Sequence, residues 1–308
     1  MFNVTIFIIQ GFSFTPGLKL PIFVAFLIIY LTIIFGNTTI FAVIALDSHL
    51  HVPMYVFLSN LSFLDILYSS TILPKLLVII ATQNKAIAFT GCMVQMYFFM
   101  ALACTEFLLL AVMAYDRYVA VCHPLHYFAY MSLKHCVIFA SLAWAIGLLD
   151  PILHTVLIAN LNFCLANRID HFFCDVAPLL KLTCSETTNI ELLNYIEGSL
   201  LSFSAFILTL VSYIFIISSI LKISSTNGRQ KAFSTCSSHL TCVVIFYGTI
   251  ICLYMRPSSS YSPKRDKFFA LLYVALIPLL NPFIYTLKNT EFKQAMENIW
   301  SKASLIVL

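Results

Sequence analysis

Seven segments of the chain are each long and apolar enough to cross a lipid bilayer as an α-helix. Such a helix needs about 20 mostly apolar residues, because it must satisfy its own backbone N–H and C=O groups inside the membrane. The connections are short except for one polar stretch between the fourth and fifth segments. The sequence therefore predicts an all-α membrane protein, a seven-transmembrane helix bundle. The predicted spans are residues 21–46, 54–79, 92–118, 136–159, 192–221, 233–255 and 267–287.

Composition excludes most other classes of protein. Hydrophobic residues make up 61% of the chain and charged residues 10%, whereas a soluble domain carries about 25% charged residues. The net charge is only +4 and the basic residues are scattered, so we expect no nucleic-acid partner. We find no phosphate loop, nucleophile elbow, HExxH motif or paired Cys-x-x-Cys motifs, so we expect no enzyme. A transporter remains an alternative, although the chain lacks an inverted repeat and interrupted half-helices.

Two features predict an extracellular N-terminus. Asn3 begins an Asn-Val-Thr glycosylation acceptor, which must lie outside the cytoplasm to be modified. Cys92, Cys164, Cys174 and Cys184 gather on the same side of the bundle, which fits an oxidising exterior. Because the basic residues are divided almost evenly between the two sides, the positive-inside rule does not decide. We expect a multi-pass protein of the plasma membrane, and four cysteines allow three pairings.

The domain organisation is expected to be simple, with one domain over residues 1–308. Residues 1–20 would form a short, ordered extracellular tail, and residues 160–190 a long second extracellular loop. Residues 290–301 place Phe292 and Met296 on one face and charged side chains elsewhere. This pattern predicts a short amphipathic helix that lies on the membrane surface.

Two carboxylic acids near the middle of neighbouring spans need an explanation, because a charge at the bilayer centre costs at least about 2.5–3.5 kcal/mol. Asp65 lies in the second span and Glu106 in the third, with Asn281 available from the seventh. Two such acids cannot both ionise at low cost. Either they share a proton or bind a cation such as Na⁺, or they form a neutral hydrogen-bonded cluster that joins the helices. Apart from that sodium ion, we expect no cofactor.

Asp150 and Glu197 lie in the outer halves of the fourth and fifth spans. If either side chain points into a cavity, it could select a cationic or hydrogen-bond-donating ligand. The alternative is a polar residue at a helix interface or at the level of the lipid headgroups.

Residues 113–125 read MAYDRYVAVCHPL, which resembles the signature of odorant receptors, a branch of the rhodopsin-like G-protein-coupled receptors. Further matching motifs follow in order and register along the whole chain. They are GN at 36–37, HVPMY at 51–55, LSNLSFLD at 58–65, SY at 212–213, KAFSTCSSHL at 231–240 and PLLNPFIY at 278–285.

The resemblance implies a signalling switch. Arg117 would be held by Asp116 in the inactive state and would swing toward a G protein of the stimulatory olfactory type in the active state, raising cyclic AMP. The disulfides it implies are Cys92–Cys174 and Cys164–Cys184. The implied switch residues are Asp116, Arg117, Tyr118, Tyr213, Asn281, Pro282 and Tyr285.

The resemblance also implies an outward-facing cavity for a small, mostly apolar, volatile odorant, with Tyr247 as the aromatic toggle. A non-olfactory chemosensory receptor for a small metabolite remains the alternative, since a metabolite and an odorant would bind such a cavity by the same physical interactions. The implied lining residues are Met96, Phe99, Met100, Ala103, Cys104, Val176, Glu197, Ser202, Phe206, Tyr247, Ile250, Ile251, Tyr254, Leu271 and Val274.

Overall fold

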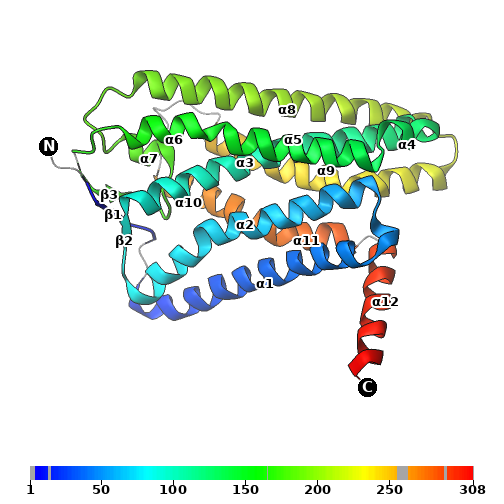
Figure 1. Ribbon diagram of the computed structural model, residues 1–308, viewed down its shortest axis with the longest axis horizontal. Coiled ribbons are helices and arrows are strands. Elements are labelled where there is room, and N and C mark those ends of the chain that lie inside the picture. The colour runs from blue at the N-terminus through cyan, green and yellow to red at the C-terminus, as the bar shows by residue number, and fades with distance from the viewer. Residues whose placement is uncertain (1–3, 13–14, 165, 255–262, 288–289, 308) are drawn as a thin grey trace.

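The computed structural model describes residues 4–12, 15–164, 166–254, 263–287 and 290–307. Over these residues, seven helical segments lie side by side in an elongated bundle (Figure 1). They are α1 (Lys19–Leu46), α2 (Pro53–Thr82), α3 (Phe89–Cys122), α5 (Leu133–Leu149) with α6 (Pro151–Ala159), α8 (Thr188–Lys222), α9 (Thr226–Tyr254), and α10 (Pro263–Leu271) joined by the π-helical turn Leu272–Leu276 to α11 (Ile277–Leu287).

Each of the seven helical segments overlaps one of the seven predicted spans. Six of them are long and apolar enough to cross a membrane, and α9 contains a shorter apolar part, Cys236–Cys252. The helices α8 and α9 begin several residues before the predicted spans, at Thr188 and Thr226. Their first turns carry polar residues, so a prediction based on apolar segments places the start of each helix too late.

Close packing of the helices depends on small residues, as is usual where lipid removes the hydrophobic drive for association. A Cβ atom on Gly147 of α5 would lie 2.1 Å from Thr105 Oγ1 and 2.8 Å from the Thr105 backbone nitrogen. A Cβ atom on Gly36 of α1 would lie 3.1 Å from Pro282 Cγ. These two glycines therefore set how closely α5 approaches α3 and α1 approaches α11.

The proline in α11 leaves a backbone carbonyl without its usual partner. Pro282 has no N–H, so it cannot bond to the carbonyl oxygen of Pro278, four residues earlier. Asn37 Nδ2 from α1 donates to this oxygen at 3.1 Å and also to Ile33 O at 3.0 Å. Asn37 is fully buried, and this amide joins the first and last spans.

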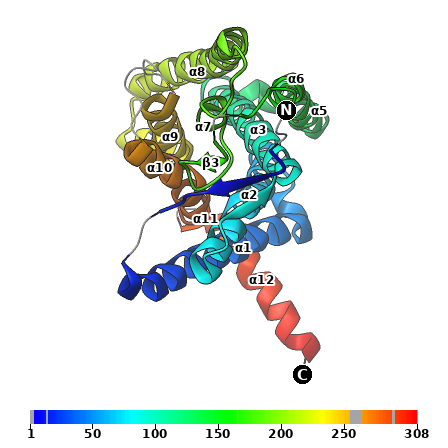
Figure 2. The same ribbon diagram turned by 90° about the vertical axis from the view of Figure 1, so that its left-hand side faces the viewer.

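A three-stranded sheet covers the end of the bundle where the described chain begins, here called the N-terminal end (Figure 2). Strand β1 (Ile6–Ile9) pairs antiparallel with β2 (Ala86–Ala88) and parallel with β3 (Arg168–Ile169). Phe7 and Ile9 are fully buried beneath it. The sequence predicts an ordered tail but not this strand, because its partners lie far along the chain.

Short helices and turns lie at both ends of the bundle. The N-terminal end has the 3-10 turn Pro16–Leu18 and α7 (Val176–Leu180). The opposite end has the 3-10 turns Ser48–Leu50 and Pro124–His126 and helix α4 (Tyr127–Tyr130).

The last helix, α12 (Thr290–Val307), projects away from the bundle at the end opposite the sheet (Figure 1). Phe292 is 1% exposed and Ala295 is 4% exposed. Tyr55 of α2 donates to Glu291 Oε2 at 3.2 Å. The helix begins where the amphipathic pattern predicts and extends past residue 301 to Val307.

We expect Asn37→Ala to lower the stability of the protein by about 1–3 kcal/mol, because the buried Pro278 carbonyl would lose its donor. The midpoint of thermal unfolding in detergent measures the effect. Thr39→Ala is the control, since Thr39 is exposed and its hydroxyl bonds to Phe35 O within its own helix. Equal midpoints for the two variants would contradict the role given to Asn37.

Candidate functional site

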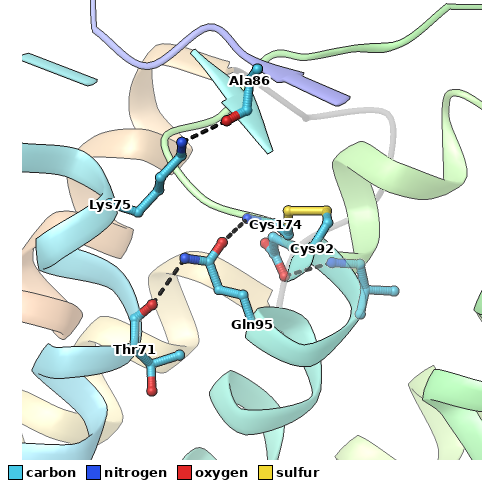
Figure 3. The surroundings of a disulfide bond; sticks show 8 residues. Thr71, Lys75, Ala86, Cys92, Gln95 and Cys174 are labelled. Atoms are coloured by element: carbon cyan, nitrogen blue, oxygen red, sulfur yellow. Dashed lines mark hydrogen bonds between the residues drawn. A yellow bond between two sulfur atoms is a disulfide. The ribbon is translucent and has the colours of Figure 1, made fainter. Parts of the chain in front are cut away.

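Two disulfide bonds hold the loop between α6 and α8 over the N-terminal end of the bundle. Cys92 at the start of α3 is bonded to Cys174, and Cys164 is bonded to Cys184. Gln95 reinforces the first bond (Figure 3): its Oε1 accepts from the Cys174 backbone N–H at 3.0 Å, and its Nε2 donates to Thr71 O at 2.9 Å. The loop is thereby fixed to both α2 and α3.

The same loop inserts aromatic side chains between the helices at the N-terminal end of the bundle. Phe172 and Phe173 are fully buried, and the Phe173 ring lies 4.7 Å from that of Phe99 on α3. His171 stacks on Phe172 at 4.8 Å. Burial, with a smaller effect of the nearby Lys267 cation, lowers the pKa of His171 to about 3, so its ring is neutral at pH 7.

Lys267 joins the loop to the N-terminal segment. Its ammonium donates to Asp170 Oδ1 at 2.6 Å and to Gly11 O at 3.0 Å. Lys267 lies on α10, so a single side chain joins three parts of the chain. The buried rings of Phe172 and Phe173 and the hydrogen bonds of Lys267 together hold this loop as a lid over the helices that carry the predicted cavity residues.

Most of the predicted cavity residues are buried or partly buried inside the bundle. Met96, Phe99, Val176, Tyr247, Ile250 and Val274 are buried, and Met100, Ala103, Cys104, Glu197, Ser202, Phe206 and Leu271 are partly buried. Ile251 is placed differently, at 45% exposed. It is about 100° around α9 from the buried Ile250, so it faces outward. The side chain of Tyr254 lies outside the described part of the structure.

Tyr247 is the centre of an aromatic cluster. Its ring lies 5.0 Å from Phe206 on α8, 5.7 Å from Phe107 on α3 and 5.3 Å from Phe246. Phe246 in turn contacts Phe107 at 4.8 Å and Tyr273 at 5.7 Å. Phe107 and Tyr273 were not predicted from the sequence, because helical periodicity alone does not say which apolar residues meet across helices.

The buried acids Asp65 and Glu106 each have a partner from the seventh span. Asn281 Nδ2 donates to Asp65 Oδ2 at 2.8 Å, and Tyr273 donates to Glu106 Oε2 at 3.1 Å. The Cys242 thiol lies 3.3 Å from Asn281 Oδ1. These carboxylate, amide and phenol oxygens are of the hard type that suits an alkali cation, and they equally suit a neutral hydrogen-bonded cluster.

A second polar cluster links α3, α6 and α8. The Cys104 thiol donates to Asp150 Oδ2 at 3.4 Å. Glu197 Oε2 lies 3.4 Å from Nδ1 of His154, which is buried. Both acids stand out in the sequence but His154 does not, because a lone histidine in an apolar span gives no sign of its partner.

Two residues of the predicted switch, Asp116 and Arg117, form an ion pair near the other end of α3. Arg117 Nε donates to Asp116 Oδ2 at 2.9 Å, and its Nη2 also donates to that oxygen. Tyr127 of α4 donates to Asp116 Oδ1 at 2.7 Å. Both charged residues are buried, so the acid neutralises the guanidinium where water is scarce.

Two further switch residues hydrogen-bond to histidines and not to this pair. Tyr213 contacts Nδ1 of His239 on α9 at 2.7 Å, and Tyr118 contacts His123 Nε2 at 3.0 Å. His239 and Tyr127 were not predicted as switch residues. Asn3 and the Tyr285 side chain lie outside the described part of the structure.

The whole chain is similar to known receptors. The family model described as "Olfactory receptor" matches residues 26–303. The chain is 46% identical over 299 residues to olfactory receptor 1C1 of Homo sapiens, covering 97% of this chain and 95% of the relative. It is 47% identical to olfactory receptor 1468 of Rattus norvegicus, covering 94% of each. The chain is a non-enzymatic, multi-pass membrane receptor and belongs to the olfactory receptor family of G-protein-coupled receptors.

Proposed function

We propose that the chain binds small, mostly apolar volatile ligands beneath the lid and activates a stimulatory olfactory-type G protein at the opposite end, raising cyclic AMP. The N-terminal end would face the exterior of the cell, with Asn3 as the glycosylation site, and the whole chain would act as one domain of the plasma membrane.

A connected series of buried rings is the observation that supports this proposal. The ring centroid of Phe173 in the lid lies 4.7 Å from that of Phe99. The Phe99 centroid lies 6.2 Å from that of Tyr273, and the Tyr273 centroid lies 5.7 Å from that of Phe246. Tyr247 packs beside Phe246 at the inner end of this series. A ligand that displaces one ring favours a different arrangement of the others, which is how differential binding shifts a population of states.

The walls of the proposed cavity suit a weak, shape-adapting interaction. Met96, Met100 and Cys104 lie along one side of α3 and offer soft, polarisable sulfur. A small ligand gains roughly 0.3 kcal/mol per heavy atom, or a few times that if it is very small. We therefore expect micromolar or weaker affinities and broad tuning.

The inner end would act as the switch. In the proposed active state, Arg117 leaves Asp116 and meets the G protein, with Tyr118, Tyr213 and Tyr285 supporting it. Asn281 and Pro282 would let the seventh span adjust. A sodium ion at Asp65, Glu106 and Asn281 would hold the inactive arrangement, as an alternative to the neutral cluster.

We expect a dose-dependent rise in cyclic AMP when cells displaying the full chain meet a chemically broad odorant panel, and we expect Arg117→Ala to abolish that rise. Antibody binding measures surface display. Arg168→Ala is the control, because Arg168 is exposed at the N-terminal end and should leave the response intact. A full response from Arg117→Ala would refute the proposed switch.

Tyr127→Phe should raise the basal cyclic AMP of ligand-free cells. The variant removes one of the donors that hold Asp116, and a hydrogen bond to a charged group is worth about 1.5–3 kcal/mol. We therefore expect the active population to grow about tenfold or more. Tyr130→Phe is the matched control, since Tyr130 lies on the same short helix and is 53% exposed. Unchanged basal signalling in Tyr127→Phe would rule out this restraint.

A further inference from the structure

The polar cluster of Cys104, Asp150, His154 and Glu197 is explained neither by the switch nor by the apolar walls of the proposed cavity. Asp150 and His154 are four residues apart, and the backbone of Asp150 is helical (φ −52°, ψ −50°) where α5 passes into α6. They therefore lie on the same face of the fourth span. Cys104 contacts Asp150 from α3, and Glu197 contacts His154 from α8.

His154 is buried with one nitrogen unused. The residue is 4% exposed, and its buried Nε2 has no hydrogen-bond partner among the described residues. A buried polar atom without a partner costs about 1–3 kcal/mol, so it needs a reason. A ligand that donates a hydrogen bond to His154 Nε2 would explain why this atom is left without a partner in the described part of the protein.

The cluster can be reached at Glu197. The Glu197 side chain is 33% exposed. Gly198, the next residue, is exposed, and a Cβ atom built on it would meet no other atom within 4 Å. A ligand can therefore approach the Glu197 carboxylate from the open side of α8.

The chemistry of the cluster selects a particular kind of head group. When His154 directs Nδ1–H at Glu197, its Nε2 carries a lone pair and can only accept. A carboxylate of Asp150 or Glu197 is also an acceptor only, and the one thiol donor already faces Asp150. An ammonium group has three donors and no acceptor. It also brings the positive charge that two carboxylates within a membrane require.

We propose that this cluster is a recognition site for the ammonium group of a small aliphatic amine, with the alkyl chain lying against Met100. Met100 is one helical turn before Cys104 on α3. The inference rests on the proposed function, since it names the ligand class of the same cavity.

The test compares unbranched primary amines with primary alcohols of the same chain lengths, at one pH, on cells displaying the full chain. We expect amines to reach half-maximal cyclic AMP at concentrations about tenfold or more below those of the alcohols. Glu197→Gln should weaken the amine response by about 10- to 100-fold, as loss of a charge-assisted hydrogen bond predicts. Any alcohol response should weaken less than the amine response, because an alcohol carries no positive charge for Glu197 to neutralise.

Glu191→Gln is the matched control, because Glu191 lies on the same helix, is exposed, and accepts a hydrogen bond from Thr187 one turn earlier, away from the cluster. It should change neither response. Asp150→Asn removes the other carboxylate and serves as a second variant if Glu197→Gln is poorly displayed.

The outcomes separate this inference from the proposed function. Equal potency of amines and alcohols, or an amine response that survives both Glu197→Gln and Asp150→Asn, would overturn the amine site. If amines are silent while other odorants raise cyclic AMP through Arg117, the amine site fails and the proposed function stands. If no odorant acts on well-displayed receptor, both proposals fail.

Discussion

A chain buried in lipid must satisfy its polar groups from within, and this requirement governs most of the structure. Asn37 supplies the donor that Pro282 cannot, and Asn281 and Tyr273 supply donors to Asp65 and Glu106. Each of these bonds also joins two helices. The side chains that satisfy the polar groups of the seventh span inside the membrane therefore also fix the position of that span in the bundle.

The seven helices could be predicted from sequence because a bilayer requires long apolar segments, and such segments are visible without knowing the fold. Strand β1 could not be predicted in the same way. Its residues, Ile6–Ile9, form a strand only because Ala86–Ala88 and Arg168–Ile169 come to lie on either side of it. Pairing over such separations leaves no local signal.

The site shows the same division. The charged pair of Asp116 and Arg117 is adjacent in the sequence, so it could be predicted, whereas Tyr127 and His239 reach the switch residues from other helices. Glu197 was conspicuous as an acid in an apolar span, but nothing in the sequence indicated that His154 would face it. Ile251 was misplaced for a related reason, since one position along α9 changes the face by about 100°.

The sheet at the N-terminal end also constrains how the chain is made. Its first strand is synthesised before either of its neighbours, and β3 follows it by more than half of the chain. Residues 6–9 can pair with β2 once two spans have been inserted, but the sheet is complete only after four spans have been inserted and the disulfide-bonded loop has emerged. Completion of the sheet is in this sense a late step, which marks the assembly of the lid rather than the start of folding.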